Sequence, residues 1–150
     1  MLDLVSALDV LVEGAVFVAD AVAVPRKRQR GHGIQETGGK PAQAGCKVAW
    51  AESRDEGIDH AYRLWPNAGL PGELAQVLPS VRHFEQATSL VTRESTKESV
   101  VAGPEITPHV DQLRTYAQAG YDEVYVANMG PHYLPMIEAY GREVLPALAG

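Results

Sequence analysis

The chain has 150 residues, one cysteine and a formal net charge of −6 at neutral pH. With 45% hydrophobic and 21% charged residues it has the composition of a soluble globular protein, and its acidity gives no general reason to expect nucleic acid or an anionic membrane as a partner. A single cysteine forms neither an intrachain disulfide nor a cysteine-based zinc site, which fits a cytoplasmic location.

The first 24 residues are rich in Leu, Val and Ala but are predicted to be neither a membrane span nor a signal peptide. Four acidic residues interrupt the run: Asp3, Asp9, Glu13 and Asp20. A spanning helix needs about 18–20 apolar residues, and a signal peptide needs a positive start, whereas the first basic residue here is Arg26. The stretch fits a helix and a strand equally well and stays unassigned. Residues 25–45, rich in glycine with a short basic run, are predicted to be a loop.

A strand and a helix are predicted next. Residues 47–51 form a short apolar run that is typical of a buried parallel strand. Residues 54–64 have apolar side chains at helical spacing. Pro66 ends this helix, because proline lacks an N–H and restricts the residue before it.

The following segment, residues 66–98, is interpreted as an excursion rather than a strand. It contains three prolines and two short stretches with helical periodicity, 72–78 and 81–91. A brief apolar run at residues 100–102 then leads to the next helix.

A helix over residues 108–119 has signals at both ends. Thr107 is a good N-cap, Pro108 suits the first helical position, and Gly120 suits the residue after the helix. The apolar stripe consists of Val110, Leu113 and Ala117.

The last two elements are a strand over 123–128 and a helix over 132–148, interrupted near Pro146. The apolar residues of 124–127 are not interrupted by polar ones. This pattern predicts a strand covered on both faces, as in parallel sheets. The inward residues of the helix are predicted to be Leu134, Ile137, Tyr140, Val144 and Leu145. Two parallel strands joined by a helix belong to a larger sheet, either doubly wound or an eight-fold barrel, so uncovered strand edges are expected.

The amino-acid sequences of six segments resemble one branch of the luciferase-like flavin and deazaflavin oxidoreductases. This branch includes the glucose-6-phosphate dehydrogenases that depend on coenzyme F420. The segments are Leu64–Pro79, His83–Ala87, Val100–Pro104, Ala119–Val126, Gly130–Pro131 and Tyr140–Pro146. The resemblance covers residues 36–150 in the family's order and spacing. Residues 1–35 do not resemble the family and stay an unassigned N-terminal segment.

The resemblance implies an α/β fold that is the C-terminal fragment of a (β/α)₈ TIM barrel. The seventh and eighth strands would lie at 47–51 and 123–128, with their helices and with the family's insertion at 66–98. A complete barrel needs about 250 residues, so a truncated or frameshifted chain is expected. The intact parent would transfer a hydride between coenzyme F420, rather than FMN, and an unknown small organic substrate. The isolated chain is expected to be inactive and to bind no cofactor.

Barrel active sites lie at the C-terminal ends of the strands. The substrate-pocket candidates are therefore Glu52, Ser53, Asn128, Met129 and Gly130. The family's cofactor-binding and proton-transfer groups come from earlier strands, so no catalytic or cofactor-binding residue is assigned. The five histidines, His32, His60, His83, His109 and His132, show no paired metal-ligand spacing, and no metal site is predicted. Cys46 has no activating neighbour in the sequence and is interpreted as a packed thiol.

Two alternatives stay open. The chain could be a retained barrel fragment that acts as an interaction or oligomerisation module, pairing its exposed strands with the missing barrel part or with a second copy. It could also be a complete small enzyme that dimerises to build a site between subunits. Neither alternative involves nucleic acid or a membrane.

Overall fold

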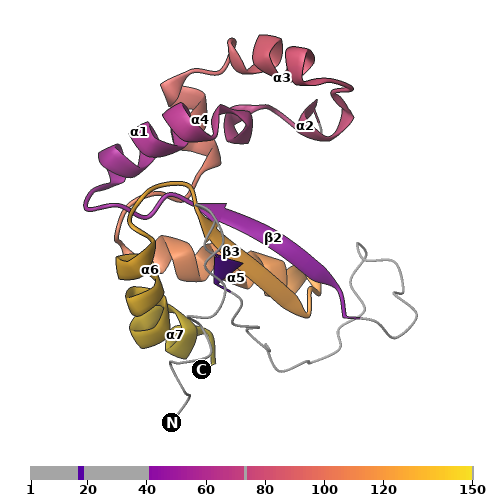
Figure 1. The fold of residues 1–150 in the computed structure, drawn as a ribbon. Helices are drawn as coiled ribbons and strands as arrows, with labels where there is room; N and C mark the ends of the chain where they lie inside the picture. The colour runs from indigo at the N-terminus through magenta and orange to yellow at the C-terminus, as the bar shows by residue number, and fades with distance from the viewer. Residues whose placement is uncertain (1–16, 19–40, 73, 150) are drawn as a thin grey trace. The chain divides into compact units, whose positions relative to one another are not determined.

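The computed structural model describes residues 17–18, 41–72 and 74–149 (Figure 1). The described chain has an α/β fold that divides into two compact units. The strand unit holds the described residues up to Lys47, residues 105–128 and residues 133–149. The helical unit holds residues 48–104 and 129–132, without residue 73. The unassigned N-terminal segment and the predicted glycine-rich loop, apart from residues 17–18 and 41–45, lie outside the described residues.

Strands β2 (Gln43–Val48) and β3 (Glu123–Asn128) are adjacent and parallel. The carbonyl of Ala42 accepts a hydrogen bond from the N–H of Asp122 at 2.9 Å. Further along both strands, the carbonyl of Val48 accepts from the N–H of Met129 at 2.8 Å, so the two strands run in the same direction. The predicted parallel pair is thereby confirmed.

The bounds of β3 are those predicted, whereas β2 begins at Gln43 and ends at Val48, earlier than the predicted 47–51. The prediction of a loop over 25–45 is therefore wrong for residues 43–45, which belong to β2. Beyond β2, Ala49 forms an isolated parallel bridge with Ala102, in the predicted apolar run 100–102.

Strand β3 is buried on one face rather than on two. Val124 and Val126 are buried, whereas Tyr125 on the opposite face is half-buried and its hydroxyl donates to Glu123 at 3.1 Å. The strand order is β1-β3-β2, in which the two-residue strand β1 (Phe17–Val18) pairs antiparallel with β3. The expectation of uncovered edges is wrong for β3 at Val126 and Ala127, where β1 pairs with it, while β2 is an edge strand of the described sheet.

Helix α5 (Ile106–Ala119) begins two residues before the predicted start. Glu105 occupies the N-cap without a side-chain hydrogen bond, so Thr107 is not the cap, and Pro108 lies in the first turn, where N–H groups have no intrahelical partner. The predicted end is confirmed, because Gly120 adopts the left-handed conformation with φ 93°.

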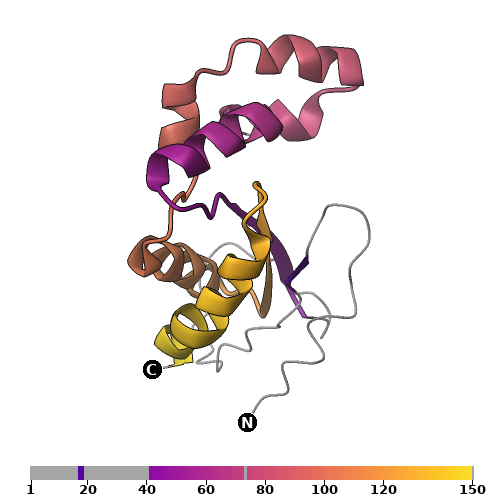
Figure 2. The ribbon, with the colours of Figure 1, turned by 60° about the vertical axis from the view of Figure 1, so that its left-hand side comes forward.

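The C-terminal segment is not one regular helix. It consists of α6 (Tyr133–Ala139), a π-helical turn, η2 (Tyr140–Val144), and α7 (Leu145–Ala149), which contacts α5 (Figure 2). Leu134, predicted to point inward, is 55% exposed, and Met136 is buried instead. The N–H of Leu145 donates to the carbonyl of Tyr140, five residues back, which makes this turn wider than a turn of an α-helix.

The helical unit contains α1 (Arg54–Leu64), η1 (Pro66–Gly69), α2 (Leu74–Val77), α3 (Val81–Thr88) and α4 (Arg93–Ser99). The bounds of α1 match the prediction. The stretches predicted at 72–78 and 81–91 are helical over shorter ranges, and α4 was not predicted. Its start is a capping box between Thr92 and Ser95. None of the described helices is long and apolar enough to cross a membrane.

Helices α1 and α4 lie side by side (Figure 1), tied by the guanidinium of Arg93, which donates to both Asp59 and Asp55. Beneath α1 a small apolar core contains Ala49, Ile58, Ala61, Ala102 and Met129. The close approach of α1 to this core requires a glycine at position 57, because a Cβ there would lie 2.3 Å from the carbonyl oxygen of Ala49.

Candidate functional site

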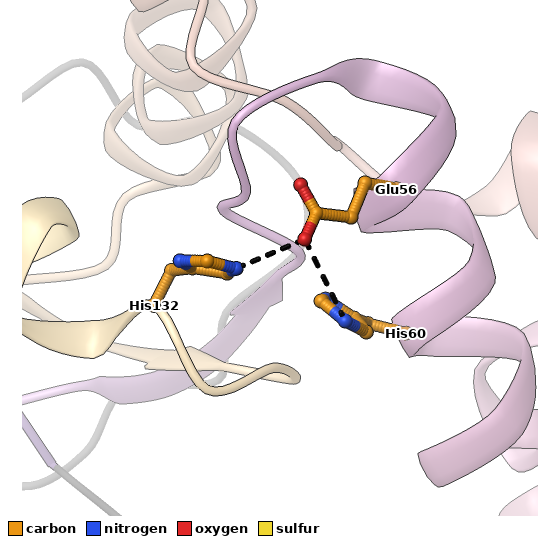
Figure 3. Close-up of side chains that lie close together, drawn as sticks. All are labelled: Glu56, His60 and His132. Atoms are coloured by element: carbon orange, nitrogen blue, oxygen red, sulfur yellow. Dashed lines mark hydrogen bonds and ion pairs between the residues drawn. The ribbon is translucent and has the colours of Figure 1, made fainter.

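Within the helical unit, Glu56, His60 and His132 converge on one point (Figure 3). We call these three residues the Glu–His–His cluster. The Oε1 atom of Glu56 lies 3.1 Å from Nε2 of His132 and 4.0 Å from Nε2 of His60. One potential ligand atom from each residue lies within 4.8 Å of the other two. The cluster brings together a carboxylate and two imidazoles, which can exchange protons or bind a metal ion.

The cap of α1 fixes the Glu56 carboxylate. Ser53 is the N-cap, and its hydroxyl oxygen accepts a hydrogen bond from the N–H of Glu56 at 3.2 Å. The side chain of Glu56 turns back, so that Oε2 accepts from the N–H of Glu52 at 3.0 Å. Oε1 is therefore left to face the two imidazoles. The hydrogen bond from His132 lowers the pKa of Glu56, so its side chain is a carboxylate at neutral pH.

His60 follows Glu56 by one helical turn and points to the same side of α1. Its side chain is only 13% exposed, and its Nδ1 atom is buried without a hydrogen-bond partner among the described residues. The ring packs against Gly130, where an added Cβ would lie 3.0 Å from Nδ1. The missing side chain at position 130 makes room for this imidazole.

His132 comes from the loop between β3 and α6, far from α1 in the sequence. Its side chain is 26% exposed, and its ring centroid lies 5.7 Å from that of His60. The loop thus carries the third member of the cluster to Glu56, which lies 76 residues earlier in the sequence.

Two of the predicted substrate-pocket residues lie at the start of α1. Ser53 is exposed and uses its hydroxyl oxygen to cap the helix. Glu52 is also exposed, and its N–H binds the Glu56 carboxylate. Glu52 therefore borders the Glu–His–His cluster.

The other three candidates follow β3. Asn128, the last residue of the strand, is half-buried. Met129 is 2% exposed and packs in the core of the helical unit, so its side chain contributes to packing. Gly130 lies against the ring of His60. The structure thus brings Glu52 and Gly130 to the same cluster from two different segments.

One sequence pattern predicts part of the cluster, although the spacing between histidines alone does not reveal it. Glu56 and His60 are four residues apart on a helix, which places both side chains on one face. The other described histidines have separate partners: His83 binds the hydroxyl of Ser80, and buried His109 binds the hydroxyl of Tyr140.

Cys46 lies within β2 and is buried. Burial raises the pKa of its thiol to about 11, against a smaller opposing effect of a hydrogen bond with Tyr116. A thiol with so high a pKa is almost entirely protonated at neutral pH and is a poor nucleophile. The interpretation as a packed thiol is confirmed.

The chain matches no described protein family and no curated protein sequence.

Proposed function

We propose that residues 36–150 are the C-terminal part of a luciferase-like, F420-dependent oxidoreductase barrel, with β2 and β3 as its seventh and eighth strands. The observation that carries the proposal is the parallel β2–β3 pair, which α5 connects after a long helical excursion. This order agrees with the barrel segments that the resemblance implies. In a closed barrel the first strand would lie beside the eighth and run parallel to it. Here β1 lies beside β3 but runs antiparallel to it.

In the intact parent, this part would form one wall of the substrate pocket. The carboxyl ends of β2 and β3 lead to Glu52 and Gly130, at the edge where barrel enzymes carry their active sites. The reaction would be hydride transfer between the deazaflavin and a small organic substrate, with the hydride carried by the cofactor and the protein supplying binding and orientation. We expect the parent to act in the cytoplasm.

Two cations of the helical unit are already paired with carboxylates. In the helical unit, Arg93 is held by Asp59 and Asp55, and Lys97 is paired with Glu94. Cations already neutralised in this way are poorly placed to hold a phosphate tail. In the resembled family the cofactor site comes from earlier strands, so no step of the reaction is assigned to these residues.

Split-barrel complementation tests the proposal. The 150-residue chain is co-expressed with the first six strand-helix units of an F420-dependent luciferase-like oxidoreductase that lacks its own seventh and eighth units. We expect the two chains to co-purify and the complex to bind coenzyme F420, as followed by cofactor fluorescence. The six-unit part alone, and the same part with an unrelated α/β domain, are the controls. Failure of the two chains to associate would contradict the barrel assignment.

The edge position of β2 supports a second candidate, an interaction module. An edge strand offers unpaired backbone groups to another strand, from a second copy or from a larger partner. Sedimentation of the full chain should then show a dimer if the partner is a second copy. If the partner is larger, affinity purification should recover it in stoichiometric amount. Gly45→Lys should abolish either association, because an added Cβ at this position meets no atom within 4 Å and a charge on an edge strand opposes pairing. A monomer without partners would exclude this candidate.

A further inference from the structure

We propose that the Glu–His–His cluster binds one divalent transition-metal ion of the zinc class, with Oε1 of Glu56 and one imidazole nitrogen each of His60 and His132 as ligands. The site goes beyond the proposed oxidoreductase function, in which no metal takes part. It lies wholly within the helical unit, so its formation does not require the rest of a barrel.

The spacing of the donor atoms is close to that of a coordination sphere. Zinc bonds of about 2.0–2.2 Å in tetrahedral geometry separate neighbouring ligand atoms by about 3.3–3.5 Å. The Glu56–His132 pair, at 3.1 Å, is already near this value, and the Glu56–His60 pair, at 4.0 Å, is within about an ångström of it. All three donor atoms lie within 4.8 Å of one another, so side-chain rotations that bring them closer would close the ligands around one ion.

The carboxylate is oriented by groups outside the cluster, as ligands of metal sites usually are. The backbone N–H of Glu52 holds Oε2, and the N-cap of α1 fixes the start of the helix from which Glu56 projects.

The donor set also indicates the class of metal. Two imidazoles and one carboxylate suit zinc and its neighbours, whereas calcium and magnesium prefer oxygen ligands alone. Three protein ligands leave a fourth position for water or another molecule. The side chains of Glu56 and His132 are 36% and 26% exposed, so this position is reachable from solvent.

The test uses the full chain, purified without a histidine tag and stripped with a chelator. Zn²⁺ binding is measured by calorimetry, and Co²⁺ serves as the spectroscopic probe, because its visible absorption reports imidazole ligands and coordination number. We expect one ion per chain, saturable at micromolar concentration or below. Added Zn²⁺ should displace Co²⁺ and bleach the absorption. Because imidazole must be neutral to bind a metal, acidification should weaken binding.

Three variants test the ligands. His60→Ala and His132→Ala should each lower the Zn²⁺ affinity more than about 100-fold, beyond the 10–100-fold that loss of an outer-shell partner costs. Glu56→Gln keeps an oxygen that can accept from the N–H of Glu52 but loses the charge, and it should also weaken binding. His83→Ala is the matched control, because His83 lies on α3 and bonds to Ser80. Its affinity should equal that of the wild type.

Circular dichroism of each variant separates loss of a ligand from loss of the fold. His132 lies outside the helices, so its replacement should leave the helical signal unchanged. Binding in the wild type that His60→Ala and His132→Ala do not alter would overturn the proposal, as would the absence of saturable Zn²⁺ binding up to millimolar concentration. Neither result bears on split-barrel complementation, which tests the oxidoreductase assignment separately.

Discussion

The hydroxyl of Tyr140 and Nδ1 of His109 are joined by a hydrogen bond of 2.8 Å between two buried side chains, with their rings edge to face. This bond ties the π-helical turn to α5 inside the strand unit. Burial raises the pKa of Tyr140, so its hydroxyl keeps its proton at neutral pH.

Tyr140→Phe should therefore destabilise the chain. The substitution keeps the ring but removes the hydroxyl that His109 binds, and such a loss in a buried place costs about 1–3 kcal/mol. Urea unfolding followed by circular dichroism measures the change. Tyr125→Phe is the control, because that hydroxyl bonds to Glu123 near the surface, and its loss should cost less than about 0.5 kcal/mol. Equal effects of the two substitutions would contradict the buried contact.

Gly57→Ala should be among the most damaging single-methyl additions in the helical unit. The new Cβ would lie 2.3 Å from the carbonyl oxygen of Ala49 and 3.1 Å from the amide nitrogen of Gly103, both of them backbone atoms. Overpacking of this kind costs about 1–3 kcal/mol or more, although alanine favours a helix more than glycine does. Gly45→Ala, where an added Cβ meets nothing within 4 Å, should change the free energy of unfolding by less than about 0.5 kcal/mol. Thermal and urea unfolding of both variants provide the comparison.

Cys46 should react slowly with thiol reagents while the chain is folded. Its pKa is raised to about 11, so the fold favours the neutral thiol. This preference stabilises the chain below the unfolded pKa of about 8.5 and is lost as the pH rises through 11. Reaction with a chromogenic disulfide at pH 8 should be at least tenfold faster in concentrated urea than in buffer, after correction for the effect of urea on a free thiol. A rapid reaction of the folded chain would show that Cys46 is accessible.

The isolated chain should not bind oxidised or reduced coenzyme F420. Under the proposed assignment the cofactor-binding residues would come from earlier barrel strands, and Arg93 and Lys97 are already ion-paired. Titration against the cofactor, followed by its absorbance and fluorescence, measures this directly. Saturable micromolar binding would favour the complete small enzyme, and Asn128, Met129 and Gly130 would then be the first residues to mutate.

Elements with local signals could be predicted from the sequence, and elements that depend on partners could not. Helical spacing and Pro66, which follows the end of α1, predicted the observed bounds of this helix. Helix α4 was missed because only one of its residues, Thr96, is buried, which leaves no apolar stripe to detect. The start of β2 was missed because it is set by pairing with β3, which no local pattern reveals.

The same distinction explains the candidate site. The four-residue spacing of Glu56 and His60 on α1 is a local pattern that could be predicted from the sequence. The spacing between histidines alone does not reveal it. His132 joins them only through the fold, across 76 residues of sequence from Glu56. The predicted pocket residue Met129 lies at the end of a strand, as expected, but the direction of its side chain into the core depends on packing.

Because Gly130 contacts the His60 ring, a side chain at position 130 and an imidazole at position 60 would occupy the same space. A side chain at position 130 would meet the imidazole at 3.0–3.4 Å, so residue 130 could gain a Cβ only if the ring gave way. Homologous chains should therefore show exchange between the two positions, with a smaller or differently shaped residue at 60 wherever 130 carries a side chain. The residue at 130 would thus mark which relatives keep the histidine at 60.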